Sequence, residues 1–503
     1  MVVHTGIVIG IFCYFLGIIF VGYLLRHKNK TAEDFLVGGR SFGILFNAGT
    51  LTSCWVGGAL IVGIPGTFYS LGIWNSDAMY GILVSFGSAG CLILAGMFYM
   101  RKLWGLKLLS LGDFYYKRYG GKAGLVATIL MALTFTVWIS VQVIAFAKVG
   151  SALVGFSLNT WIILALAVIC TYTILGGLWA VCLTDLIQVV IVTVSLFILT
   201  PVAIGMVGGL DVFWNHVPKE KLEWLPRDMG SFKAWLPWLG ALCTVGLGSI
   251  ASPDLMQRAF SAKTGRTASH SAYVATAAYL VILVTIIILT LATMQMVDMG
   301  TVDKALIEGD PELMIPLVFQ NLMPGPLVVL FLGAVMAAVM SAAATANIAL
   351  AGVISKNLIH DVFFPDMSSR NLMQLTRVVI LVIGVIAAGI AVGLPSAYLL
   401  TSLGFDLILS CLFIPLTLGL YWSKANGLGA IAGLVGGAVF RIGGAGMAYG
   451  FGVESIAAAT TTDTWFYFTL GGPLFSLACM VLVTLLTQKI DKPIVLEIEP
   501  DPA

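Results

Sequence analysis

Two hydroxyl side chains, Ser341 and Thr345, lie in the otherwise apolar stretch AVMSAAATAN at residues 338–347. Together with Ala338 they follow the spacing i, i+3, i+7, which places all three on one face of a helix. Two explanations fit such a face. The hydroxyls can bond back to carbonyls one turn earlier while the small residues pack against another helix. Alternatively, they can be oxygen ligands of a hard monovalent cation, by analogy with the all-oxygen sites of calcium and magnesium.

Carboxylates inside apolar segments are the second group that could do chemistry, because a charge at membrane depth is costly and usually functional. Asp185 lies in the stretch CLTDLIQ, between polar neighbours. Asp406 lies in TSLGFDLILS, without a basic neighbour in the sequence. Asp254 precedes Arg258 by four positions, so a local ion pair is the simpler explanation for that carboxylate.

Glycine and proline interrupt two apolar segments, which a spanning helix tolerates only where protein groups or a water-lined cavity satisfy the freed backbone. The segment at 43–62 contains Gly57 and Gly58 in mid-span, and the segment at 236–256 contains Pro253. The two segments occupy corresponding positions in two halves of the chain. In transporters, unwound helices at such positions hold cations through their carbonyls. The alternative is that these glycines only allow close packing of helices.

The elements that must position these groups are membrane-spanning helices. Of the 503 residues, 59% are hydrophobic and only 10% are charged, whereas a soluble domain carries about a quarter charged residues. About thirteen apolar runs are long enough to cross roughly 30 Å of hydrocarbon as helices. They lie near residues 5–25, 43–62, 73–99, 123–152, 159–177, 181–206, 236–256, 271–296, 324–355, 372–393, 396–422, 427–448 and 465–487. We therefore predict an all-α polytopic membrane protein.

Basic residues gather in alternate loops and so predict the orientation. Arg26, Lys28 and Lys30 follow the first helix, which places that loop in the cytoplasm, the N-terminus outside and the C-terminus inside. The first helix lacks a basic leader and a small-residue cleavage site, so we interpret it as a retained span. We predict one transmembrane transporter domain at 1–487 in a plasma (inner) membrane, followed by a short, disordered cytoplasmic tail at 488–503.

Several classes of protein do not fit the sequence. The eight cysteines fall in apolar segments and the five histidines near loops or termini, without metal spacing or a disulfide framework. We find no phosphate-cradling glycine loop and no credible Ser-His-Asp set, and therefore predict no enzyme activity and no organic cofactor. We find no basic footprint for nucleic acid, and the oligomeric state is left open.

Four motifs together resemble the sodium/solute symporter family over nearly the full chain. They are FLVGGRSFG (35–43), GGLWAVCLTDLIQ (176–188), MQRAFSAK (256–263) and LGAVMAAVMSAAATAN (332–347). Within that family, TSCWVGGAL and GAIAGLVGGAVFRIGG are most similar to the high-affinity choline transporter branch. The resemblance implies a leucine-transporter-type fold. It has a leading helix (5–25), two inverted repeats of five helices each (43–206 and 236–422) and two trailing helices (427–487).

The resemblance also implies sodium as the coupling ion. In family members one sodium ion is held by carbonyls at the first break and by a carbonyl and two adjacent hydroxyls on the ninth helix. Carried over, the ligands are the carbonyls of Ser53, Val56 and Ala338 and the hydroxyl of Ser341. The second hydroxyl position is Ala342 here, which implies a weaker site or a substitute water. A second sodium position implies Asp185, Ser341 and Thr345, while a further hydroxyl position of that pattern is Ala344.

For the solute, the choline branch implies an aromatic cage, because quaternary ammonium groups bind the faces of aromatic rings. Trp55 matches one cage tryptophan, and Trp138 lies near another. The tryptophan that this branch carries on the seventh helix falls near Ser252, which argues against choline itself. The candidates for the solute pocket, each of which could equally be a packing residue, are Trp55, Trp138, Gln142, Ser252, Asp254 and Asp406.

The function that these features favour is sodium-coupled symport of a small polar organic solute by alternating access. The solute could be an amino acid, a carboxylate or a quaternary amine. The first alternative keeps the fold but uses a proton, or no ion, with Asp185 or Asp406 titrating. A passive channel is less favoured, since neither a filter-like repeat nor charged rings occur. A membrane-embedded enzyme or sensor is disfavoured as well.

Overall fold

The computed structural model describes residues 5–71, 79–217, 230–300, 303–394, 396–450 and 463–501. Helices make up nearly all of this part of the chain. Within it, the one β-type contact is an isolated bridge between Phe42 and Ala262. The all-α architecture expected from composition is therefore confirmed.

The helices follow one another along the chain as a series of long spans separated by short connecting helices. They are α1 (Thr5–Leu25), α2 (Ala32–Val37), α3 (Ile44–Trp55), α4 (Ile64–Leu71), α5 (Met79–Leu94), α6 (Met100–Trp104), α7 (Leu111–Tyr119), α8 (Gly121–Val154), α9 (Leu158–Val207), α10 (Leu210–His216), α11 (Phe232–Gly246), α12 (Pro253–Ser261), α13 (Gly265–Asp298), α14 (Lys304–Gly309), α15 (Met314–Leu322), α16 (Gly325–Val353), α17 (Asp361–Phe363), α18 (Ser369–Gly393), α19 (Ala397–Ile408), α20 (Ile414–Tyr421), α21 (Gly427–Gly450) and α23 (Asp463–Thr487).

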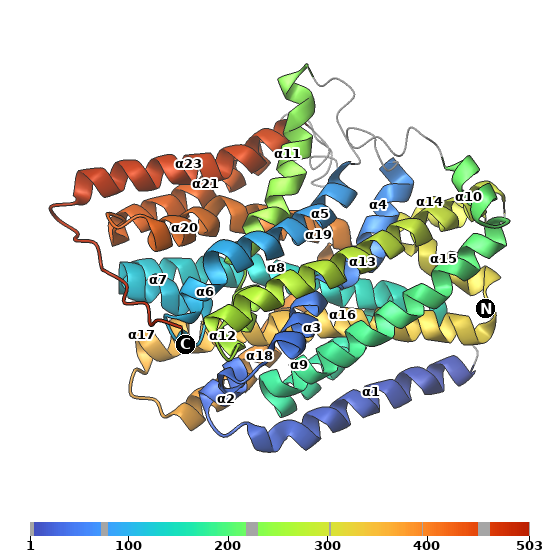
Figure 1. The fold of residues 1–503 in the computed structure, drawn as a ribbon, viewed down its shortest axis with the longest axis horizontal. Coiled ribbons are helices and arrows are strands. Elements are labelled where there is room, and N and C mark those ends of the chain that lie inside the picture. The colour runs from blue at the N-terminus through green and yellow to red at the C-terminus, as the bar shows by residue number, and fades with distance from the viewer. Residues whose placement is uncertain are drawn as a thin grey trace.

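Nine helices in the described residues are long and apolar enough to cross a membrane, or up to ten if one bent pair counts as a single span. The 50-residue α9 consists of two helices that meet at the non-helical Gly177 (φ 57°, ψ −159°), near the boundary between the predicted spans 159–177 and 181–206. The long helices run roughly side by side, and the two chain ends lie at opposite ends of the bundle (Figure 1). The count of thirteen spans, the domain limits and the orientation stay predictions.

The bent pair is the first predicted helix break. The segments Ile44–Trp55 and Ala59–Gly66 meet at 48°, because Val56 leaves the helical region (φ −88°, ψ 79°). Glycine is required at the break by close packing. A Cβ on Gly57 would lie 2.8 Å from the Cβ of Ala342, closer than two carbons can approach.

The second predicted break separates α11 from α12. A short turn at Gly248–Ala251 follows α11, and the extended Ser252 (φ −85°, ψ 137°) precedes Pro253 at the first turn of α12. Proline fits there because the first turn of a helix has no backbone acceptor for its missing N–H. A Cβ on Gly248 would lie 2.8 Å from the carbonyl oxygen of Phe405.

Helix α16 brings the two breaks together. It packs against α3 and α12, the broken elements, and against α8 and α9. Its residues 334–353 are all buried, which the small side chains of this stretch permit because they let neighbouring backbones approach closely. The stretch that carries the two hydroxyls is thus at the centre of the molecule.

The expectation of a disordered tail is wrong for residues 488–501. Arg118 donates hydrogen bonds to the carbonyl oxygens of Ile494 (2.7 Å) and Ala425 (2.8 Å). The Glu499 N–H donates to the Gly105 carbonyl oxygen at 2.9 Å. The carboxylate of Asp501 accepts from the Gly265 N–H at the start of α13, at 2.6 Å. Hydrogen bonds to Arg118, Gly105 and Gly265 order this short, acidic segment, and composition does not reveal these distant partners.

Candidate functional site

A side chain from another helix forms a hydrogen bond with the backbone at the break between α3 and α4. Gln142 of α8 accepts a hydrogen bond from the Gly58 N–H through its Oε1 atom, at 2.9 Å. A break exposes backbone groups that no longer have helical partners, and this amide satisfies one of them. The Nε2 atom of Gln142 is buried without a partner. Gln142, predicted for the solute pocket, therefore lies at the helix break.

The residues expected to hold a sodium ion lie on the two elements that meet here. Ser53 and Val56 belong to the end of α3 and its break, while Ala338 and Ser341 belong to α16. The close approach of Gly57 to Ala342 shows that position 342 faces the gap directly. The Ser53 hydroxyl donates to the Thr50 carbonyl oxygen at 3.1 Å, which leaves its backbone carbonyl as the group relevant to an ion.

Asp185 of α9 is fully buried and surrounded by hydrogen-bond donors. Its Oδ1 atom accepts from the Ser341 hydroxyl, and its Oδ2 atom accepts from the Thr345 hydroxyl at 3.1 Å. The structure thus brings together the three residues that the second sodium position implied. The packing explanation for the two hydroxyls does not describe these bonds, because neither hydroxyl bonds back to its own helix here.

The sequence-based interpretation missed Arg258 of α12, which lies in the same cluster. Its Nη2 atom is 3.1 Å from Asp185 Oδ2 and donates to the Thr345 hydroxyl oxygen at 2.7 Å. Its side chain is 0% exposed, as is that of Asp185. Arg258 pairs across the bundle rather than with Asp254, which instead accepts from the Leu255 N–H at 2.7 Å. The motif MQRAFSAK contained this arginine, but nothing local in the sequence pointed to Asp185.

A narrow cavity lies beside the first break. It is lined by Trp55, Ala59, Leu60, Ile64, Ser85, Ser88, Trp138, Val245, Tyr279, Thr401 and Phe405. Four of these side chains are aromatic and none is charged. The Phe405 ring lies 4.8 Å from the Trp138 ring and 5.9 Å from the Trp55 ring, centroid to centroid. The Nε1 atom of Trp55 is buried without a partner.

Two of the predicted pocket residues, Trp55 and Trp138, line this cavity, and four do not. Gln142 is at the break, and Ser252 and Asp254 start α12. The cavity also contains Tyr279 and Phe405, which the sequence analysis did not single out. They come from α13 and α19, far from Trp55 in the chain, so only the fold brings them together.

Asp406 points away from the cavity into a second buried ion pair. Its Oδ2 atom lies 2.7 Å from Arg441 Nη2 on α21 and accepts from the Thr469 hydroxyl on α23 at 3.0 Å. Its Oδ1 atom accepts from the Thr244 hydroxyl on α11 at 3.0 Å. The basic partner absent from its sequence neighbourhood is thus supplied by a trailing helix.

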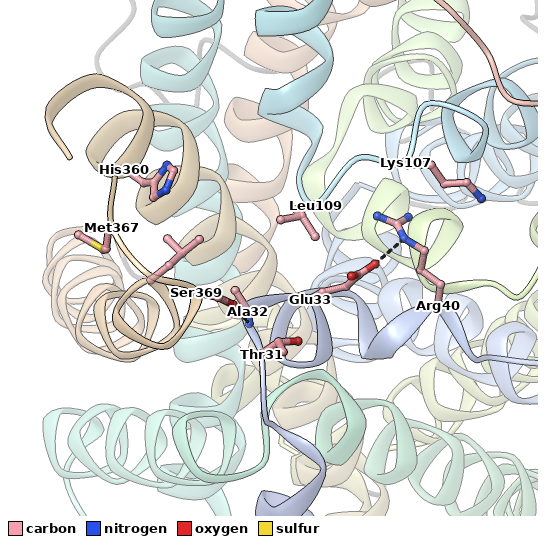
Figure 2. Close-up of a pocket in the computed structure, with 10 residues that line it drawn as sticks. Thr31, Ala32, Glu33, Arg40, Lys107, Leu109, His360, Met367 and Ser369 are labelled. Atoms are coloured by element: carbon pink, nitrogen blue, oxygen red, sulfur yellow. Dashed lines mark hydrogen bonds and ion pairs between the residues drawn. The ribbon is translucent and has the colours of Figure 1, made fainter. Parts of the chain in front are cut away.

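A larger, open pocket lies at the end of the bundle near the C-terminal tail (Figure 2). Its lining includes Glu33, Arg40, Lys107 and His360. The Glu33 and Arg40 side chains pair at 2.8 Å, and both belong to the segment around α2. None of the predicted site residues lines this pocket.

A model of the family described as Sodium:solute symporter family matches residues 35–437. The chain is 27% identical to high-affinity choline transporter 1 of Caenorhabditis elegans, over 97% of this chain and 86% of that protein. It is 24% identical to the osmoregulated proline transporter OpuE of Bacillus subtilis (strain 168), over 96% and 95% of the two chains.

The structure is similar to a substrate-bound, outward-open Na+-coupled sialic acid symporter, with a TM-score of 0.79, 16% identity and 98% of each chain covered. It also resembles Mhp1, a nucleobase-cation-symport-1 family transporter in a closed conformation, with a TM-score of 0.56, 16% identity and coverage of 92% and 96%. At 16% sequence identity, these two similarities support a shared fold and carry no statement about the function of this chain. The fold is the leucine-transporter type, as expected.

Proposed function

Because the chain belongs to the sodium:solute symporter family and is thus a membrane transporter rather than an enzyme, we propose that it couples sodium entry to uptake of a small organic ammonium compound. The observation that carries this proposal is the position of Trp55. It lines the aromatic cavity, and the next residue is Val56, where the helix breaks. Solute and ion would therefore bind to adjacent residues of one interrupted segment.

The sodium ion would lie between the break and α16, with oxygen ligands from Ser53, Val56, Ala338 and Ser341. A hydroxyl has one proton to donate and two lone pairs. Ser341 can therefore donate to Asp185 and still offer a lone pair to the ion. Asp185 would act through Ser341 by fixing the direction of its hydroxyl, as hydrogen-bond partners of metal ligands generally do.

The cavity chemistry favours a cationic group on the solute. Aromatic faces attract an ammonium group by about 0.5–2 kcal/mol per ring, most strongly when water is excluded. A free carboxylate would need a basic side chain, and the described lining residues include none. The partnerless Trp55 N–H could donate to an oxygen on the solute, such as a hydroxyl. Choline, the substrate named for several relatives, has both groups and is the probe we would use first for this class, while Ser252 near the position of the seventh-helix tryptophan favours a related ammonium compound as the solute itself.

Coupling requires that both ligands favour the same conformation, because a ligand shifts an equilibrium only by its differential affinity. Sodium at the break would fix the carbonyls next to Trp55 and so orient its ring. We expect sodium to lower the half-saturating solute concentration for this reason.

The test is uptake of radiolabelled choline into proteoliposomes under an inward sodium gradient, a potassium gradient or a proton gradient. We expect accumulation only with sodium. Uptake that follows pH and ignores sodium would favour the proton-coupled alternative, and uptake that never exceeds equilibrium would favour a passive channel.

The solute class is tested separately by thermal shift of the purified protein with choline, betaine, proline and acetate, each in sodium and in potassium. Trp55→Ala should raise the half-saturating solute concentration by about tenfold, the loss of roughly 1.4 kcal/mol, whereas Trp55→Phe should retain part of the affinity. Equal affinity in the wild type and Trp55→Ala would remove Trp55 from the solute site.

A further inference from the structure

We infer that Arg258 is a built-in cation that closes the second ion position, so that the transporter binds one sodium ion per solute. The inference rests on the proposed function and specifies its stoichiometry. It concerns the cluster of Asp185, Arg258, Ser341 and Thr345, whose side chains are all fully buried.

Both carboxylate oxygens of Asp185 and the hydroxyl oxygen of Thr345 already accept hydrogen bonds within this cluster, whereas the Ser341 oxygen only donates and keeps its lone pairs for the proposed first sodium ion. Asp185 Oδ2 accepts from both Arg258 and Thr345, and Asp185 Oδ1 accepts from Ser341. The Thr345 oxygen in turn accepts from Arg258 at 2.7 Å. The guanidinium therefore contacts two of the three residues that would hold an ion here.

The charge count leads to the same conclusion. One carboxylate and one guanidinium make a neutral cluster. A sodium ion added to it would place two positive charges against a single negative one at a site that water does not reach. An extra buried ion must be compensated by an opposite charge, and Asp254, the other buried carboxylate near Arg258, accepts from the Leu255 N–H and forms no ion pair with Arg258, which pairs with Asp185.

The built-in cation also explains how Asp185 can be kept charged without an ion from solution. Arg258 further donates to the Gln257 Oε1 atom at 3.0 Å, and Gln257 donates to the Leu36 carbonyl oxygen at 2.7 Å. These bonds tie α12, the half-helix after the second break, to α2 and α9. A side chain does this permanently, whereas an ion would do it only while bound.

The consequence for transport is energetic. Each coupled ion multiplies the solute accumulation ratio by the ion gradient across the membrane, so a second sodium ion would square the chemical part of that ratio. The Arg258 guanidinium pairs with the same carboxylate, but it is covalently attached and does not cross the membrane. It therefore adds no driving force for solute uptake. It is therefore a determinant of ion stoichiometry.

The experiment counts sodium directly, without any solute. Binding of 22Na+ to purified protein is titrated to saturation for the wild type, Arg258→Ala, Arg258→Lys and the double variant Arg258→Ala/Asp185→Asn. We expect one ion per wild-type molecule, two for Arg258→Ala, one for Arg258→Lys and one for the double variant. Size-exclusion profiles show which variants remain folded.

A wild-type count of two overturns the inference by itself, even if no variant folds. A folded Arg258→Ala that still binds a single ion overturns it as well. A wild-type count of zero with one ion bound by Arg258→Ala upholds the built-in cation and refutes sodium coupling instead. A gain in Arg258→Ala that survives Asp185→Asn would place the new ion elsewhere and also count against the inference.

Discussion

The substitution Ala342→Ser tests whether position 342 faces a bound sodium ion. Ala342 is 1% exposed and lies opposite Gly57, where even a Cβ would come within 2.8 Å of it. A serine hydroxyl at 342 would therefore point into the gap of the broken helix or bond back to the Ala338 carbonyl one turn earlier. In the first orientation it adds one oxygen ligand to the proposed sodium site.

The expected magnitude follows from the value of a single polar contact. A buried hydrogen-bond-like interaction contributes about 1 kcal/mol net, and 1.4 kcal/mol corresponds to tenfold in affinity. We therefore expect Ala342→Ser to lower the half-saturating sodium concentration by about fivefold. The assay is choline uptake, or sodium-dependent thermal shift, as a function of sodium at constant ionic strength.

Ala343→Ser is the matched control. It adds the same atom to the same helix at another fully buried alanine, turned about 100° away. It should leave sodium affinity unchanged. If both variants behave like the wild type while remaining folded, the hydroxyl added at position 342 does not ligate an ion, and that result counts against the proposed site.

Three further predictions concern side chains that stabilise the first helix break, the Asp406 ion pair and the packing of the C-terminal segment. Gln142→Leu leaves the Gly58 N–H without its acceptor and should lower stability by about 1–3 kcal/mol, measured as a decrease in melting temperature in detergent. Arg441→Met leaves the buried Asp406 carboxylate without its basic partner and should lower the free energy of unfolding by about 3–5 kcal/mol. Adding Asp406→Asn should recover most of that loss, and a double variant as unstable as the single one would contradict the pairing. Asp501→Asn weakens the contact with the α13 start and should speed proteolysis of the tail without changing sodium affinity; an unaltered cleavage rate would speak against docking.

The breaks and the central helix could be predicted from sequence because their causes are local. Gly57 and Gly58 within an apolar run indicate an interrupted helix, and small residues around Ser341 indicate close packing. Asp185 could be identified because a carboxylate in a membrane-spanning segment is costly and is therefore usually functional. Local patterns of this kind were enough to indicate the fold and the ion-binding region.

The partners of these residues could not be predicted, because they come from distant parts of the chain. Arg258 had a carboxylate four residues earlier, so the local pair with Asp254 was the simpler interpretation. Asp406 had no basic neighbour in sequence, since Arg441 reaches it from a trailing helix. Phe405 and Tyr279 resemble any other aromatic residue of a core until the fold places them beside Trp55.

The C-terminal segment at residues 488–501 packs against the helix bundle, so its hydrogen bonds can be used to follow conformational changes of the protein. Its Glu499 N–H is hydrogen-bonded to Gly105, next to α6, and Asp501 contacts the start of α13. An amide in such a bond exchanges its hydrogen with solvent only when the bond opens. Deuterium incorporation at the Glu499 amide therefore reports how the end of α6 and the nearby start of α13 move while the ion and solute sites stay unlabelled.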